Sequence, residues 1–120
     1  MKTLKFNGEE LYLEVRQYMN DRIAILAYTK EDLYGDVTIN LSGMSLDNEH
    51  GGFINSYTKD GGLEKKLIKE GIIEKVVGTV KYNMGKYDEV VFNLEKLKEY
   101  DREGVEKYLQ NEDEEEEECE

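Results

Sequence analysis

The chain has 120 residues, a formal net charge of −12, no proline, no tryptophan, one cysteine and one histidine. This length fits one domain with a hydrophobic core of its own. No apolar run approaches the ~18 residues of a membrane span, and residues 1–8 lack the apolar segment of a signal peptide. One cysteine excludes an internal disulfide, which fits a reducing compartment. We therefore expect a cytoplasmic protein that does not contact a membrane.

Most of the negative charge lies at the C-terminal end. Residues 112–120 contain eight of the 28 acids and no base, which leaves 20 acids and 16 bases in residues 1–111. Within this body, residues 1–55 hold nine acids against five bases, whereas residues 56–111 hold eleven of each. A block of like charge repels itself and gains nothing by packing. The sequence thus predicts one folded domain over residues 1–111 and a disordered acidic tail over residues 112–120.

The first third of the chain alternates apolar and polar side chains, as β-strands do. Asn7-Gly8 favours a tight hairpin turn, and Asn20-Asp21 offers a second one. Apolar side chains occur at successive positions of one segment, residues 23–28, which is typical of a central strand covered on both faces. In the last strand we expect Thr38 and Asn40 to face outward. The predicted strands are 4–6, 11–18, 23–28 and 37–41.

The second half mixes helices and strands. Asp60 or Gly61 can cap the start of a helix, and Gly71 suits the left-handed position after its end. Asp101 or Gly104 is expected to break a C-terminal helix. After an irregular stretch over 42–52, the predicted elements are a strand over 53–57, a helix over 63–70, strands over 73–82 and 87–94, and a helix over 94–110. The predicted fold class is α+β: an antiparallel β-sheet of five to seven strands with one inserted helix and a C-terminal helix.

The 28 acids leave a chance pair of acid–base carboxylates open, but other residues able to carry catalytic chemistry are few. His50 lies in a loop with Asp47 and Glu49, but a transition-metal site needs a further nitrogen or sulfur ligand, and the one cysteine is Cys119. A polar loop is the favoured interpretation, and metal binding by this loop stays open. Cys119 lies among glutamates, which disfavour the reactive thiolate. The glycine pairs do not form a phosphate-binding loop. We expect a protein that is not an enzyme and uses no cofactor or metal.

The nine tyrosines are an unusual feature of this composition. Aromatic side chains on a β-surface can stack on nucleobases, but a single-strand site also needs positive charge, and residues 1–55 are net negative. Half-buried packing, with the hydroxyl in water, is the favoured interpretation. Nucleic acid is therefore not the expected partner.

Four segments of the chain carry a family resemblance: Tyr18 to Ile25, Asp36 to Leu41, Phe53 to Asn55 and Tyr87 to Leu94. They resemble a small family of uncharacterised domains from conjugative elements and phages of low-GC Gram-positive bacteria. The similarity covers residues 11–97, whereas the loop over 42–52 and the acidic tail differ from the family pattern. It brings no catalytic residue, and it implies a context in which small acidic proteins often inhibit host defence proteins.

Together these features predict a non-enzymatic inhibitor or modulator that occludes a basic surface of a host or defence protein. The alternative is a module that binds single-stranded nucleic acid and has an acidic tail that screens the site. Recognition residues concentrate in loops held by a rigid scaffold, and the first half of the chain carries the excess acids of the body. The predicted partner-binding residues are Glu31, Asp32, Tyr34, Asp36, Asp47 and Glu49.

Overall fold

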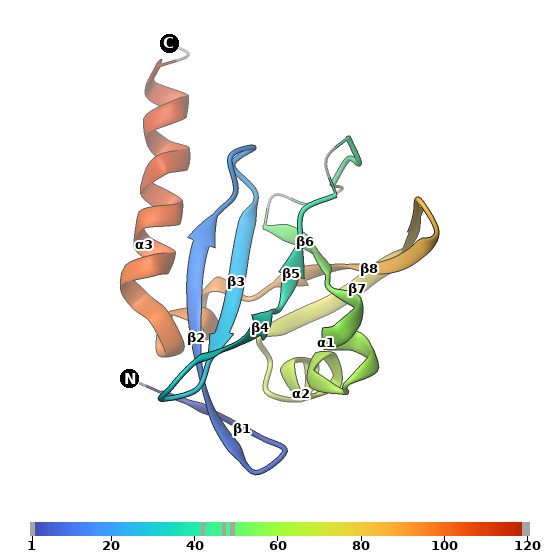
Figure 1. Cartoon of the computed structure of the whole chain (residues 1–120). Coiled ribbons are helices and arrows are strands. Elements are labelled where there is room, and N and C mark those ends of the chain that lie inside the picture. Colours follow the sequence, from blue (N-terminus) through green and yellow to red (C-terminus); the bar gives the residue numbers. More distant parts are fainter. Residues whose placement is uncertain (1, 42, 47, 49, 119–120) are drawn as a thin grey trace.

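The computed structural model describes residues 2–118 except 42, 47 and 49, with side chains described through residue 110. The predicted α+β class is confirmed, and the elements follow one another as Figure 1 shows. The strands are β1 (Leu4–Phe6), β2 (Glu9–Gln17), β3 (Ile23–Tyr28), β4 (Leu33–Asp36), β5 (Thr38–Ile39), β6 (Gly51–Ile54), β7 (Ile73–Tyr82) and β8 (Gly85–Phe92). The helices are α1 (Ser56–Asp60), α2 (Leu63–Lys69) and α3 (Leu94–Glu118).

The strands are divided between two antiparallel sheets of four strands each. The first sheet is a meander with the order β1-β2-β3-β4, and the second has the order β5-β6-β8-β7. Tight turns follow β1 and β2 where the sequence predicts them, because Asn7 (φ 51°) and Asp21 (φ 69°) adopt the left-handed conformation that such turns require. The structure therefore has two sheets where the strand pattern predicts one.

The chain passes from the first sheet to the second at Val37 and Thr38. The Val37 amide donates to the carbonyl of Ile25 in β3 (2.9 Å), and its carbonyl accepts from the amide of Asn55, after β6 (3.0 Å). The Thr38 hydroxyl accepts from the Ile25 amide (3.1 Å). The prediction that Thr38 faces outward is wrong, since this side chain is 2 % exposed. The hydroxyl of Thr38 accepts the hydrogen bond of the Ile25 amide in place of a backbone carbonyl of a neighbouring strand.

A short helix follows β6, where the sequence predicts that a strand continues to residue 57. The side chain of Asn55 accepts a hydrogen bond from the Tyr57 amide (3.2 Å) and so caps the start of α1. Ser56 and Tyr57 are therefore helical, and the predicted strand ends early. The next helix, α2, starts after Gly62 (φ 88°) and is followed by Gly71 (φ 79°), as predicted for its C-terminal end.

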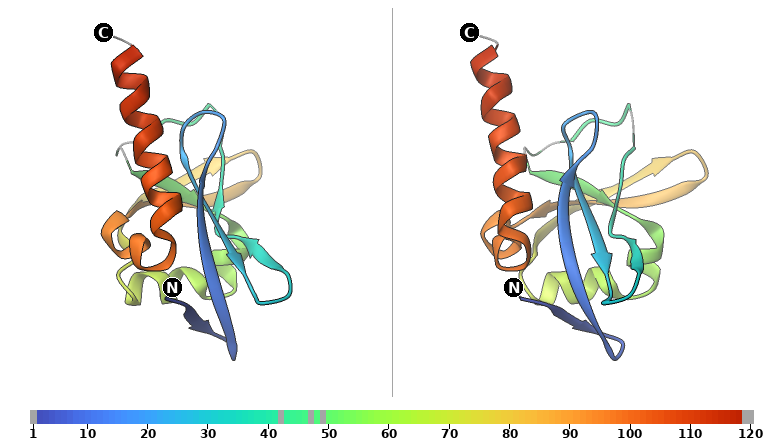
Figure 2. Two further views of the ribbon diagram at one scale, coloured as in Figure 1. Left: turned by 90° about the vertical axis from the view of Figure 1, so that its left-hand side faces the viewer. Right: turned by 60° about the vertical axis from the view of Figure 1, so that its left-hand side comes forward.

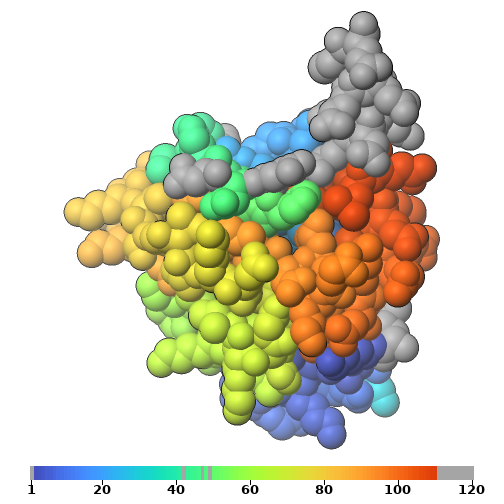
Figure 3. All heavy atoms as spheres, turned by 180° about the vertical axis from the view of Figure 1, so that it is seen from behind, coloured from blue at the N-terminus to red at the C-terminus, as the bar shows by residue number. Residues whose placement is uncertain are grey.

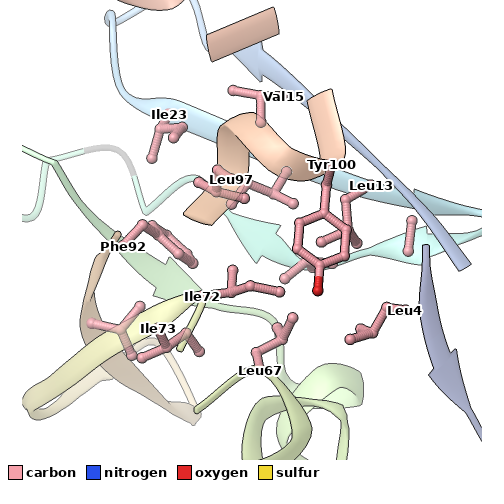
Figure 4. Packing of buried hydrophobic residues seen from close by; sticks show 14 of the residues in the cluster. Leu4, Leu13, Val15, Ile23, Leu67, Ile72, Ile73, Phe92, Leu97 and Tyr100 are labelled. Atoms are coloured by element: carbon pink, nitrogen blue, oxygen red, sulfur yellow. The ribbon is translucent and has the colours of Figure 1, made fainter. Parts of the chain in front are cut away.

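The hydrophobic core lies where both sheets meet α2 and α3. Figure 4 shows Tyr100 of α3 at the centre of this cluster, near Leu97 and facing side chains of the first sheet and of α2. Tyr100 and Leu97 are 1 % and 0 % exposed. Burying side chains of this size stabilises a fold by about 1.5–3 kcal/mol each. The first two turns of α3 are thus an integral part of the core.

A kink in α3 brings this helix against β2 (Figure 2). Asp101 has non-helical backbone angles (φ −154°, ψ 78°). Its carboxylate accepts from the Gly104 amide (3.0 Å), which caps the second half of the helix, and from the Val15 amide of β2 (2.9 Å). The sequence predicts this break at Asp101 or Gly104, and the structure places it at Asp101. The contact covers a part of β2 that β1 leaves unpaired.

The backbone of α3 runs through Glu118, and the side chains of residues 111–118 lie outside the described part. The predicted disorder of residues 112–120 therefore stays a prediction. In the part of the chain that the structure describes, no helix is both long and apolar enough to cross a membrane.

Gly104→Ala is expected to destabilise the fold by about 2–3 kcal/mol. A methyl group at this position would overlap the Asp101 carboxylate and the Val15 carbonyl oxygen. Gly78→Ala is the matched control, because a methyl group on β7 meets no atom within 4 Å. Urea unfolding of both variants measures the difference. Equal midpoints for the two variants would contradict the close approach of α3 to β2.

Candidate functional site

The turn between β3 and β4 carries the first predicted partner-binding residues. The Thr29 side chain organises this turn, since its hydroxyl accepts hydrogen bonds from the amides of Glu31 (3.4 Å) and Asp32 (3.1 Å). The Thr29 amide also donates to the Asp32 carbonyl (2.8 Å). Both acidic side chains are exposed. The turn thus has a defined shape and presents two carboxylates to solvent.

β4 forms an uncovered edge of the first sheet. Among the strands that the structure describes, it pairs only with β3, and the register shifts between Ala27 and Tyr28. Leu33 and Tyr34 are 53 % and 41 % exposed, and Asp36 is exposed beside them. Large apolar side chains of this kind are usually buried, so a pair of them on an edge strand is a feature that a binding partner can cover.

Tyr57 extends this surface from the neighbouring helix α1. A small hollow of about 80 Å³ lies between β4 and α1, and its lining includes Tyr34, Asp36 and Tyr57. Tyr57 itself is 87 % exposed. We use the name acid–tyrosine surface for the set Glu31, Asp32, Tyr34, Asp36 and Tyr57.

The structure brings together four of the six predicted partner-binding residues, namely Glu31, Asp32, Tyr34 and Asp36, on one hairpin. The other two, Asp47 and Glu49, lie outside the described residues. Sequence reasoning missed Tyr57, because it places this residue in a strand and not at the exposed start of a helix. The signal that identifies the helix is Asn55, a side chain that favours the cap position.

His50, considered above as a metal ligand, lies against Tyr108 of α3. The Nδ1 atom of His50 is 3.4 Å from the Tyr108 hydroxyl oxygen, and the two rings meet edge to face. The Tyr108 side chain is buried, so this contact attaches the end of the loop over 42–50 to the core.

A pair of buried carboxyl groups lies between the second sheet and the helices α1 and α2. Glu64 of α2 and Asp88 of β8 are each 6 % exposed, and they are hydrogen-bonded to each other. Asp88 Oδ1 also accepts from Lys59 Nζ (3.0 Å) and from the Thr79 hydroxyl (2.7 Å). The pair therefore joins α1, α2, β7 and β8 at one point.

The two carboxyl groups share one proton. Burial, the hydrogen bond to Asp88 and the negative charge of that residue together raise the pKa of Glu64 from 4.5 to about 7. Burial alone would raise the pKa of Asp88, but hydrogen bonds from Glu64, Thr79 and Lys59 outweigh burial and lower it. Glu64 thus keeps its proton below about pH 7, whereas Asp88 is ionised there.

The burial of the Glu64–Asp88 pair is typical of a structural contact between elements and not of an accessible active site. Both side chains are more than nine-tenths buried, and Oε1 of Glu64 has no hydrogen-bond partner among the described residues. The sequence gives no signal for the pairing, because 28 acids allow many chance pairs.

A larger groove of about 600 Å³ runs between β2 and α3. Its lining includes the acids Glu14 and Glu103 and the bases Arg16 and Lys107. Charges of both signs line this groove, so it favours neither an anionic nor a cationic ligand. The acid–tyrosine surface has the more definite chemical character.

The fold and these surfaces define a small α+β domain that has two antiparallel sheets and an acidic, aromatic edge. The family model described as "Domain of unknown function (DUF4313)" matches residues 12–112, and the chain belongs to this family. A family of unknown function agrees with the resemblance noted in the sequence. Neither the curated proteins nor the solved structures contain a match to this chain.

Glu64→Gln is expected to change how stability depends on pH. Between pH 4.5 and about 7 the folded chain holds a proton on Glu64 that the unfolded chain has released, so wild-type stability falls as the pH rises through this window. The glutamine amide donates to Asp88 at every pH and removes this fall, which amounts to about 3 kcal/mol at most.

Chemical denaturation at about pH 5 and pH 8 measures this difference. The free energy of unfolding of Glu64→Gln, relative to that of wild type, should be higher at about pH 8 than at about pH 5. Glu74→Gln, at an exposed position of β7, should show the same pH dependence as wild type. Parallel curves for wild type and Glu64→Gln would show that the buried proton is absent.

Proposed function

We propose that the chain is a non-enzymatic inhibitor or modulator, of the counter-defence type carried by phages and mobile elements, that occludes a basic surface of a partner protein. The acid–tyrosine surface is the proposed contact. The resemblance to domains of conjugative elements and phages supports the context, and the exposed edge of the first sheet supports the mode of action. The partner is a host or defence protein.

One observation carries this proposal: exposed tyrosines and carboxylates occur together on a rigid edge. Tyr34 and Tyr57 flank one hollow, and acidic side chains lie on both sides of Tyr34 in the sequence. Tyrosine is enriched among the residues that dominate binding energy, because its ring buries a large area and its hydroxyl bonds at the rim. Carboxylates around such anchors speed the encounter with a basic partner and exclude acidic ones.

The edge strand offers a second kind of contact. Among the described strands, β4 pairs with β3 alone, so a partner strand can pair along its other side. This free stretch ends before Asp36, whose carbonyl accepts a hydrogen bond from the Thr58 hydroxyl of α1 (3.2 Å). A stable interface covers roughly 800 Å² of each partner. In Figure 1 the β3–β4 turn lies at one end of β4 and α1 at its other end. The hollow lined by Tyr34, Asp36 and Tyr57 joins β4 to α1.

The test uses a partner captured from a lysate of a low-GC Gram-positive host, identified and then purified. Its affinity for the chain is measured by calorimetry. Glu31→Lys/Asp32→Lys/Asp36→Lys is expected to weaken binding at least tenfold, because it replaces attraction to a basic surface by repulsion. Tyr34→Ala/Tyr57→Ala should cost about 2 kcal/mol or more.

The matched control reverses three exposed acids of α3, Glu95, Glu103 and Glu106. It makes the same change of net charge at another place and should leave the affinity within about twofold, since its surface ion pairs contribute little. Binding that survives reversal of the three β3–β4 acids, or that falls equally in both triple variants, would contradict the proposed surface.

A further inference from the structure

The hairpin of β7 and β8 has a charge opposite to that of the whole chain. Residues 75–87 contain three lysines and no acid, whereas the chain has a net charge of −12. The hairpin extends from the body as a two-stranded ribbon (Figures 1 and 3). Most of β7 is exposed, and Met84 at the turn is fully exposed. We call residues 75–87 the basic ribbon.

Two lysines oppose each other at the outer end of this ribbon. Lys81 of β7 and Lys86 of β8 are direct cross-strand partners, and both are exposed. Like charges at such positions destabilise a sheet. Neither lysine has an ion-pair partner in the described part of the chain. An anion bound between them would relieve this repulsion.

The nearest acid on this face of the ribbon is already neutralised. Asp88 follows Lys86 by two residues and so lies on the same face of β8, but it is buried and bound by Lys59 and Thr79. The charge of Asp88 is therefore offset by its own cation and does not cancel the charges of Lys81 and Lys86.

The other face of the ribbon is aromatic. Val80 pairs with Tyr87, and Tyr82 pairs with Gly85, so both tyrosines share one face. The ring of Tyr87 lies over Gly85, where any larger residue would collide with it. Both tyrosines are half-buried, so each leaves part of its side chain exposed. Positive charge next to partly exposed tyrosines is the combination that single-stranded nucleic acid requires: charge for phosphates and rings for bases.

We propose that the basic ribbon binds single-stranded nucleic acid without sequence preference. Lys75, Lys81 and Lys86 contact phosphates, and Tyr82 and Tyr87 stack on bases. The ribbon is two strands wide, and lysine stems can reach around it, so a flexible single strand can contact both faces where a stiff duplex cannot. This site is separate from the acid–tyrosine surface and does not depend on its function.

The negative charge of the rest of the chain does not prevent this contact. At about 0.15 M salt the Debye length is ~8 Å, which is short beside the 49 Å length of the molecule. The expectation that nucleic acid is not a partner rests on the net charge of residues 1–55, and the ribbon lies outside them. Three phosphate contacts imply weak binding, with a slope of log K against log salt of about −2.

Fluorescence anisotropy of a labelled oligo-dT of about 20 nucleotides, titrated with the full chain at about 50–200 mM NaCl, tests the site. Lys81→Glu/Lys86→Glu is expected to weaken binding at least tenfold. Lys5→Glu/Lys30→Glu, at two exposed lysines of the first sheet and its turn, makes the same change of net charge and should stay within about twofold of wild type. Tyr82→Leu/Tyr87→Leu should weaken binding severalfold while the salt slope stays the same.

Two further measurements separate a loss of binding charge from a loss of folded structure. Lys81→Gln/Lys86→Gln removes the like-charge pair and cannot destabilise the hairpin by repulsion, so a loss of binding in this variant reports the missing charges. Thermal unfolding confirms that each variant is folded. No binding at about 50 mM NaCl, equal losses in both glutamate pairs, or tighter binding to a duplex of the same length would overturn the proposal.

Discussion

The rest of the structure depends on the hydrogen bonds at the point where the chain changes sheets. Val37 bonds to β3 through its amide and to Asn55 through its carbonyl, and the Thr38 hydroxyl satisfies the amide of Ile25. A buried amide or carbonyl without a partner costs about 1–3 kcal/mol. These bonds therefore allow a chain to leave one sheet and start another inside the core, and they hold the two sheets together there.

This change of sheets separates charge in space. β4 ends the first sheet and is left as an edge whose turn carries Glu31 and Asp32, whereas β7 and β8 belong to the second sheet and extend from it as the basic ribbon. Asp88, the acid nearest the two ribbon lysines on their own face, is buried with its own cation and with a protonated neighbour, Glu64. The net charge of −12 therefore does not give the local charge of either surface. The acid–tyrosine surface is negative and carries Tyr34 and Tyr57, whereas the basic ribbon is positive and carries Tyr82 and Tyr87.

The local pattern predicted the elements well because turns and periodicity are local properties. Asn7 and Asp21 lie in the predicted turns, and the apolar run over 23–28 is the central strand β3, whereas the strand β4 was not predicted. Contacts between distant segments could not be predicted in this way. The alternating pattern places Thr38 on the surface, whereas in the structure its hydroxyl accepts a hydrogen bond from the Ile25 amide in the core. The spacing of residues likewise does not indicate that Glu64 of α2 pairs with Asp88 of β8.

The central claim is that the fold places an acidic edge and a basic ribbon on different sheets. Paramagnetic relaxation of backbone amides by a cationic and by an anionic nitroxide probe measures the electrostatic potential near each residue without a binding partner. The account predicts a negative potential at residues 29–36 and a positive potential at residues 75–87, in one sample and at one salt concentration. A negative potential at both segments would contradict it.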